Sequence, residues 1–118
     1  MTRTVLIVDD YEPFRDSARG LLQSGDFDVV GEAEDGHGAV RLAEELRPEV
    51  VLLDVHMPDL DGFEVARRLA RLEQPPVVVL TSSRDDYAAL VPGSAAHAFV
   101  RKDALSAEAL EAAVRDLS

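Results

Sequence analysis

The sequence predicts an α/β domain built around a parallel sheet. Five short runs of apolar residues recur along the 118-residue chain, and segments with helical spacing of apolar residues separate them. Runs of Val, Ile and Leu without polar alternation are typical of strands covered on both faces, as in parallel sheets. Strands that alternate with helices favour right-handed strand–helix–strand units. We therefore expect residues 1–118 to form one doubly wound domain with one core.

The five expected strands are the apolar runs, and four of the expected helices carry apolar stripes. Pro13 suits the first turn of the first helix, while Gly25, Pro48 and the Pro75-Pro76 pair mark helix ends. The strands cover residues 4–8, 27–30, 50–53, 77–80 and 98–100. The stripes, with spacings of three and four, are Phe14, Ala18, Leu21 and Leu22; Ala39, Leu42, Ala43 and Leu46; Val65, Leu69 and Leu72; and Leu110, Ala113, Val114 and Leu117.

The segment between the fourth and fifth strands has a poor helical pattern. Tyr87 to Val91 is compatible with a turn of helix, but Pro92-Gly93 follows at once. Proline removes a backbone donor and clashes with the preceding turn. We expect a fourth helix that is short, distorted or mobile over residues 84–95.

Composition and charge exclude several classes of protein. The chain has 12 basic and 23 acidic residues, a net charge of −11 and no cysteine. The negative charge repels nucleic acid and anionic membranes, so this domain is not expected to bind DNA. Without cysteine there are no disulfides, thiolate catalysis or cysteine-ligated zinc. With no apolar segment of membrane-spanning length and no recognisable signal peptide, a cytoplasmic location is expected.

Polar residues stand where the expected strands end. They are Asp9 and Asp10 after the first strand, Asp54 after the third, Thr81-Ser82-Ser83 after the fourth, and Arg101-Lys102 after the fifth. Ligands of doubly wound sheets bind at the carboxyl ends of the strands, so these side chains should converge. Three close carboxylates repel one another and imply a hard divalent cation, Mg²⁺ or Mn²⁺. A lysine, a hydroxyl and such a cation suit a phosphoryl group, which a carboxylate can accept.

These residues resemble the receiver domain of bacterial two-component response regulators, and the resemblance covers essentially the whole chain. The matching motifs are the Asp9-Asp10 pair, the segment DVHMPDLDG from Asp54 to Gly62, the Thr81-Ser82 pair, and Phe99-Val100-Arg101-Lys102. Each motif alone is weak, but together, in order and each at a strand end, they are specific. The resemblance implies a flavodoxin-like sheet with strand order 2-1-3-4-5.

The resemblance implies a phosphorylation site centred on Asp54. Asp54 would take a phosphoryl group from the phosphohistidine of a sensor histidine kinase and hold it as an acyl phosphate. Asp10, Asp54 and the backbone carbonyl of His56 would ligate Mg²⁺, and Asp9 would act mostly through bound water. The only chemistry implied is self-phosphorylation and slow self-dephosphorylation, so the domain is not expected to be an enzyme.

The resemblance also implies a switch around that site. Lys102 would pair with the phosphoryl oxygens, and Thr81 would hydrogen-bond them and draw its loop inward. Phe99 would change rotamer with the loop and shift the output face. His56 and Ser83, two residues past Asp54 and Thr81, would border the phosphoryl group and influence its lifetime. Two alternatives stay open: His56 as an exposed residue that offers only its carbonyl, and Ser82 in place of Thr81.

The implied partners are a sensor histidine kinase and an attached or partner output domain that controls transcription. The Lys102-Asp103 pair resembles regulators with a helix-turn-helix output domain, and a homodimer is compatible with the family. Ala95 and Ala98 stand where receivers commonly carry glycine, so the output face departs most from the family pattern.

Three rival functions remain as alternatives. An aspartate-nucleophile phosphohydrolase also uses a strand-end Asp and Mg²⁺, but those enzymes carry a second aspartate where His56 stands. A flavin-binding electron carrier shares the architecture, but the acidic residues at positions 9–12 would repel its phosphate. A receiver-like interaction module that is never phosphorylated is disfavoured because the full set of site residues is retained.

Overall fold

Five parallel strands form a sheet in the order β2-β1-β3-β4-β5. The computed structural model describes residues 2–84 and 86–115. The strands are β1 (Arg3–Val8), β2 (Phe27–Ala33), β3 (Val50–Asp54), β4 (Val77–Ser82) and β5 (Ala98–Arg101). The predicted fold class and strand order are confirmed. Because the order reverses between β1 and β3, the carboxyl ends of these two strands border the crevice where such sheets bind ligands.

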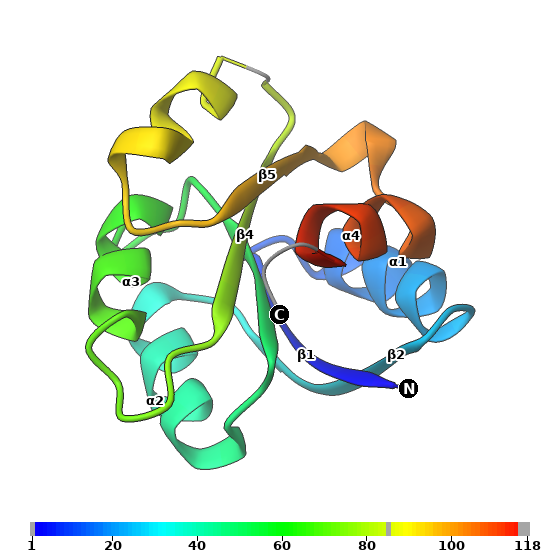
Figure 1. Cartoon of the computed structure of the whole chain (residues 1–118), viewed down its shortest axis with the longest axis horizontal. Helices are drawn as coiled ribbons and strands as arrows, with labels where there is room; N and C mark the ends of the chain where they lie inside the picture. Colours follow the sequence, from blue (N-terminus) through cyan, green and yellow to red (C-terminus); the bar gives the residue numbers. More distant parts are fainter. Residues whose placement is uncertain (1, 85, 116–118) are drawn as a thin grey trace.

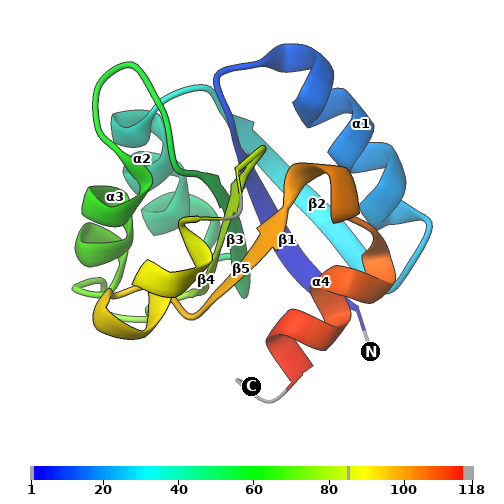
Figure 2. The same cartoon turned by 90° about the horizontal axis from the view of Figure 1, so that it is seen from above.

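Helices cover both faces of the sheet (Figures 1 and 2). On one face lie α1 (Glu12–Gln23) and α4 (Ala107–Val114), and on the other lie α2 (Gly36–Leu46) and α3 (Gly62–Leu69). The side chains of Asp35, Asp61 and Ser106 cap α2, α3 and α4 by accepting a hydrogen bond from the N–H three residues further on. Within residues 2–84 and 86–115, none of the helices combines the length and hydropathy that crossing a membrane requires.

The central strand β3 is buried along its whole length. Val50 and Leu52 pack into the core beneath α1 and α4, whereas Val51 and Leu53 pack into the core beneath α2 and α3. Because both faces are covered, the strand shows no polar alternation. Each fully buried Val or Leu side chain contributes about 1.5–3 kcal/mol. The two cores thus hold β3 and present its last residue, Asp54, at the edge of the sheet.

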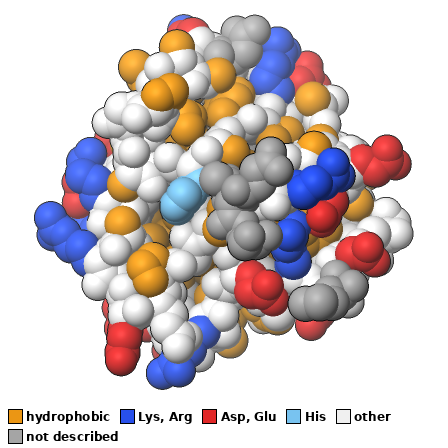
Figure 3. All heavy atoms as spheres, in the orientation of Figure 1, with side chains coloured by type: hydrophobic (Ala, Val, Ile, Leu, Met, Phe, Trp, Pro, Cys, Tyr) orange, Lys and Arg blue, Asp and Glu red, His pale blue; other side chains and the backbone are white. Residues whose placement is uncertain are grey.

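The fourth helical segment is short and distorted, as predicted. Residues Ala88–Gly93 form a 3₁₀ helix, η1, which contains Pro92 and has no buried residue. Apolar side chains lie at the surface over η1 (Figure 3), and Leu90 is 55% exposed. A second 3₁₀ helix, η2 (Lys102–Ala104), follows β5. Since η1 stands in place of an α-helix, the predicted fifth helix is α4.

The structure corrects parts of the predicted stripes. Leu21 of α1 is 40% exposed and Leu46 of α2 is 39% exposed. The buried stripe of α1 runs through Ala18 and Leu22, and Leu21 points about 100° around the helix from Leu22. Leu46 is the final residue of α2, so no following turn of the helix shields its side chain from solvent. The predicted stripe residue Leu117 lies outside the described residues.

Candidate functional site: an acidic edge of the sheet

Three carboxylates meet at the carboxyl edge of the sheet. Asp9 and Asp10 directly follow β1, and Asp54 ends the neighbouring strand β3, whose register pairs Leu53 with Val8. One carboxylate oxygen from each aspartate lies within 4.8 Å of the others. Asp9 is fully buried and Asp54 nearly so, whereas Asp10 is exposed. The fold therefore brings the predicted acidic residues together and removes two of them from solvent.

The only lysine of the sequence supplies a positive charge to this edge. Lys102 Nζ lies 2.6 Å from Asp9 Oδ2 and 3.3 Å from Asp54 Oδ1. The side chain reaches over from the end of β5, and its Nζ lies 4.7 Å from the centroid of the Phe14 ring. One ammonium beside three carboxylates leaves two negative charges, which a divalent cation would neutralise. Carboxylate oxygens are the donors that Mg²⁺ prefers, so the residues present fit this ion.

Burial and neighbouring charges raise the pKa of Asp54. Desolvation is the largest cause, repulsion from Asp9 and Asp10 adds to it, and Lys102 opposes it, so that the pKa rises from 3.8 to about 6. The pKa of Lys102 is also raised: burial disfavours the ammonium, but hydrogen bonding and attraction to Asp9 and Asp54 outweigh that cost. Without a cation, ionised Asp54 therefore opposes folding.

Asp54→Asn is expected to raise the free energy of unfolding in metal-free buffer. With a native pKa of about 6 and an ordinary value of 3.8, the ionised carboxyl destabilises the fold fully above pH 6. This cost fades as the pH falls from 6 through 3.8, and at about pH 3 the carboxyl is largely protonated in both states. Discounted for solvent screening, the gain should be about 1–2 kcal/mol at pH 7.5. Urea unfolding at pH 7.5 and at about pH 3 measures this gain in the free energy of unfolding. An equal gain at both pH values would contradict the raised pKa.

Thr81 and Ser82 are the last residues of β4 and differ in their bonding. Thr81 pairs with Asp54 across the ladder between β3 and β4, and its hydroxyl is buried without a hydrogen-bond partner among the described residues. Ser82 Oγ accepts a hydrogen bond from the N–H of Arg84 at 3.1 Å. A buried hydroxyl beside Asp54 that lacks a partner is suited to bond a group added there. This geometry favours Thr81 over Ser82 for that role.

The other predicted site residues lie around the same edge. Phe99 pairs with Leu80 in the sheet and is half-buried against the core beneath α2 and α3. Ser83 and His56 are exposed. His56 Nε2 lies 2.5 Å from the hydroxyl oxygen of Tyr87. The sequence does not connect these two side chains, because they are 31 positions apart and the motif that contains His56 does not include Tyr87.

Gly62 lets α3 begin directly against the end of β3. The Gly62 N–H donates to the Val55 carbonyl at 2.8 Å, and a Cβ on Gly62 would lie 2.7 Å from the backbone oxygen of Asp54. Gly62→Ala is expected to lower the free energy of unfolding by about 1–3 kcal/mol, because the backbone must shift. Gly93→Ala is the control, since nothing lies within 4 Å of its Cβ position. Urea unfolding compares the two, and equal losses would contradict a specific clash at Gly62.

Asp59 anchors the loop after β3 to the start of α2. Its carboxylate accepts hydrogen bonds from the N–H groups of Gly36, His37 and Leu60 at 2.8–2.9 Å, and His37 Nδ1 lies 2.6 Å away. Burial acts to raise the pKa of Asp59, but these bonds outweigh it and hold the pKa well below its usual range. Sequence reasoning included Asp59 in a motif without giving it a role. The anchor joins residues 23 positions apart, so no local signal reveals it.

Arg15 holds the backbone at Asp9, which sequence reasoning also missed. Its Nη1 donates to the Asp9 carbonyl at 2.6 Å, and its Nε pairs with Glu32 at 3.0 Å. Arg19, one turn further along α1, pairs with the other carboxylate oxygen of Glu32 at 2.7 Å. Burial acts to raise the pKa of Glu32, but the two arginines outweigh it and lower the pKa. The spacing of Arg15 and Arg19 indicates a shared face, but only the fold places Glu32 opposite them.

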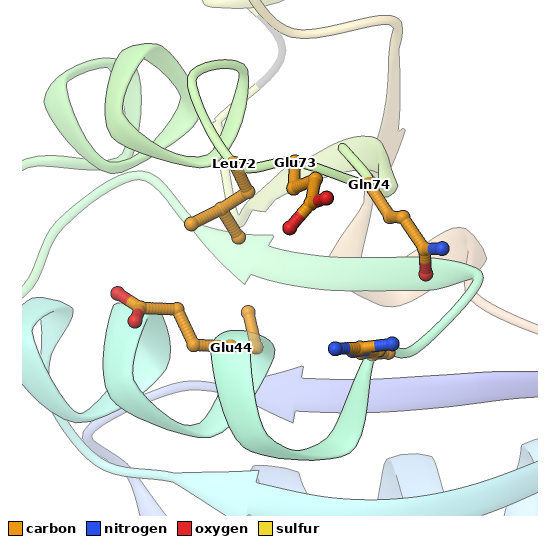
Figure 4. A pocket seen from close by; sticks show the side chains of 6 residues that line it. Glu44, Leu72, Glu73 and Gln74 are labelled. Carbon is orange, nitrogen blue, oxygen red and sulfur yellow. The ribbon is translucent and has the colours of Figure 1, made fainter.

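A separate surface pocket lies beside the amino ends of β3 and β4. Its volume is about 230 Å³, and Glu44 of α2 faces Leu72 and Glu73 across it (Figure 4). The remaining lining residues are Ala43, Arg47 and Gln74. These residues belong to the end of α2 and to the segment after α3, at the opposite edge of the sheet from Asp54. The pocket therefore has no part in the acidic site.

The fold and the acidic edge define a doubly wound α/β domain with a site suited to a divalent cation and a phosphoryl group. Residues 5–115 match the family model described as the response regulator receiver domain. The chain belongs to this family, the receiver domains of two-component response regulators, which are phosphorylation-dependent signalling switches. The family suggested by the sequence is confirmed.

Similar proteins support this assignment. The chain is 40% identical over 113 residues to a protein of Mycobacterium tuberculosis named "Probable transcriptional regulatory protein NarL", covering 92% of this chain and 51% of NarL. It is 42% identical over 79 residues to a protein-glutamate methylesterase/protein-glutamine glutaminase of Hahella chejuensis, covering 67% of this chain and 23% of that protein. The solved signal receiver domain of the M. tuberculosis NarL has a TM-score of 0.83 at 37% identity, covering 98% of this chain and 95% of that one. The chain thus spans about half or less of these curated relatives.

Proposed function

We propose that Asp54 is the residue that accepts the phosphoryl group. The observation that carries this proposal is the position of its nearly buried carboxylate, at the end of the central strand and 3.3 Å from Lys102 Nζ. A carboxylate oxygen of Asp54 would attack phosphorus of a phosphohistidine, so that a P–O bond forms as the P–N bond breaks. The group carries about 1.5–2 negative charges at pH 7, which the Lys102 ammonium would help to stabilise.

Asp10, Asp54 and the backbone carbonyl of His56 would hold Mg²⁺, or Mn²⁺, and Asp9 would act through bound water. The convergence of the three carboxylates and the surplus of two negative charges beside Lys102 support this ligand set. When bound, the cation supplies positive charge at the phosphoryl oxygens. Asp9 would also keep Lys102 in place through the ion pair at 2.6 Å.

Thr81 and Phe99 would carry the conformational switch. The buried hydroxyl of Thr81 would donate a hydrogen bond to a phosphoryl oxygen on Asp54, and the end of β4 would move with it. Phe99, in the neighbouring strand, would follow by changing its rotamer. Because η1 has no buried residue, a rearrangement of η1 would disrupt little core packing. Ser83 and His56 would border the phosphoryl group and influence its lifetime.

The phosphoryl donor would be a sensor histidine kinase, and the output an attached or partner domain that controls transcription. Similarity to a transcriptional regulatory protein supports that output. We further propose that residues 1–118 act as one cytoplasmic domain that can form a homodimer and has no contacts of its own with nucleic acid or membrane. Its chemistry would be limited to its own phosphorylation and slow dephosphorylation, although one relative carries the name of an enzyme.

Incubation with a small phosphodonor and Mg²⁺, followed by intact-mass measurement, tests this function. The protein is expected to gain one phosphoryl group, and hydroxylamine, which cleaves acyl phosphates, should remove it. A wild-type protein that gains no phosphoryl group would refute the proposal and favour an interaction module that is never phosphorylated.

A further inference from the structure

Tyr87 joins the two loops that flank Asp54 and Thr81. Its hydroxyl oxygen lies 2.5 Å from His56 Nε2, and the two rings meet edge to face with centroids 5.2 Å apart. His56 follows Asp54 by two positions, and Tyr87 directly precedes η1. The contact therefore connects the loop after β3 to the segment that leads from β4 into η1.

The surroundings of Tyr87 separate the role of its ring from that of its hydroxyl. The ring packs at the rim of the core, with its centroid 6.3 Å from that of Phe63 in α3, and the Arg84 guanidinium lies 5.8 Å from the Tyr87 centroid. These contacts need only the ring. The hydroxyl forms a hydrogen bond with Nε2 of His56, whose side chain is exposed. Removing the hydroxyl alone should therefore remove the hydrogen bond that orients the imidazole and leave the ring contacts of Tyr87 in place.

We propose that Tyr87 is a positioning residue that engages the His56 imidazole and so lengthens the lifetime of the phosphoryl group on Asp54. This inference rests on the proposed phosphorylation of Asp54. In the loss of that group, a water oxygen attacks phosphorus, the bond between phosphorus and the Asp54 oxygen breaks, and the carboxylate leaves. One proton of the water passes to solvent or remains on the phosphate.

An imidazole two residues from Asp54 is suited to orient the attacking water, because a ring nitrogen can accept a hydrogen bond from it. In the structure Nε2 is instead bonded to Tyr87. The nitrogen that points toward the segment before η1 is thus occupied, and the ring orientation is set by that bond. A released ring would gain the freedom to reach the phosphoryl group and accelerate its hydrolysis.

Tyr87→Phe tests the inference because it keeps the ring and removes the hydroxyl. After loading with a small phosphodonor and Mg²⁺ and removal of the donor, intact mass over time gives the rate of phosphoryl loss. Tyr87→Phe is expected to lose the group about tenfold faster than the wild type. Leu90→Ala, in the same segment and 55% exposed, is the control and should keep the wild-type rate.

The same measurement in a His56→Ala background separates a specific effect from a general loosening of the segment. If Tyr87 acts through His56, Tyr87→Phe should not change the rate once the imidazole is absent. A rate for Tyr87→Phe equal to or slower than that of the wild type overturns the inference, as does an equal acceleration in both backgrounds. Failure of the wild type to load at all refutes instead the proposed function.

Discussion

The Asp54→Asn variant is expected to gain no phosphoryl group from a small phosphodonor in the presence of Mg²⁺. The amide has nearly the shape of the carboxylate but lacks the anionic oxygen that attacks phosphorus. Because residue 54 ends the buried strand β3, the backbone around the asparagine should stay unchanged. Intact-mass measurement after incubation gives the stoichiometry directly, with hydroxylamine treatment to identify an acyl phosphate.

Asp28→Asn is the matched control for this experiment. Asp28 is an exposed residue of β2, outside the group of carboxylates at the sheet edge, and it should load as the wild type does. Equal loading of Asp54→Asn and the wild type would place the acceptor elsewhere. Loss of phosphorylation in both variants would show that removing a carboxylate outside the site also abolishes it. That result would contradict the assignment of Asp54 as the acceptor.

Lys102→Met is expected to give the largest loss of stability among single changes at the site. The ammonium pairs with Asp9, which is fully buried, and with Asp54, which is nearly so. Removing the ammonium leaves two desolvated carboxylates without a neighbouring positive charge. Methionine keeps most of the length and the apolar contacts of the lysine methylene chain. Because the lysine side chain is 22% exposed, we expect a loss of about 2–3 kcal/mol in metal-free buffer at pH 7.5. Urea unfolding measures this loss.

Two further measurements define the origin of that loss. Arg101→Met removes a neighbouring charge whose ion pair with Asp103 is at the surface, and it should cost no more than about 1 kcal/mol. Saturating Mg²⁺ should restore part of the stability of Lys102→Met, since the ion supplies the missing positive charge. If Arg101→Met is as destabilised as Lys102→Met, or if Mg²⁺ has no effect, the loss does not arise from unpaired carboxylates.

The fold was predictable because its signals are local. The run VVLL at 50–53 has no polar alternation, and the structure covers both of its faces. Pro92-Gly93 predicted a disrupted fourth helix, and η1 is a 3₁₀ helix that contains Pro92. Predictions failed where burial depends on a helix's neighbours: Leu21 shares an apolar pattern with Ala18 and Leu22 but is 40% exposed.

The acidic site was also largely predictable, because strand ends meet at one edge of any parallel sheet. Asp9, Asp10, Asp54 and Lys102 each stand at a strand end, and the structure brings them together. The side chains that support this edge were not foreseen. From a distant loop, Asp59 accepts hydrogen bonds from the first two N–H groups of α2, and Arg15 donates a hydrogen bond to the Asp9 carbonyl. In the sequence, Asp59 and Arg15 cannot be distinguished from ordinary charged surface residues, because their hydrogen-bond partners come close only in the folded chain.

The strand and helix pattern, the strand-end residues and the family could be predicted from the amino-acid sequence, because they follow from local periodicity and motif spacing. The folded arrangement was needed to show which side chains are desolvated, which donors they meet and which loops are in contact. Burial at the end of β3, together with repulsion from Asp9 and Asp10, raises the pKa of Asp54 to about 6 even though Lys102 opposes the rise. The contact between Tyr87 and His56 likewise exists only because β3 and β4 are neighbours in the sheet. Desolvation and long-range contacts depend on packing in space, which no short stretch of sequence encodes.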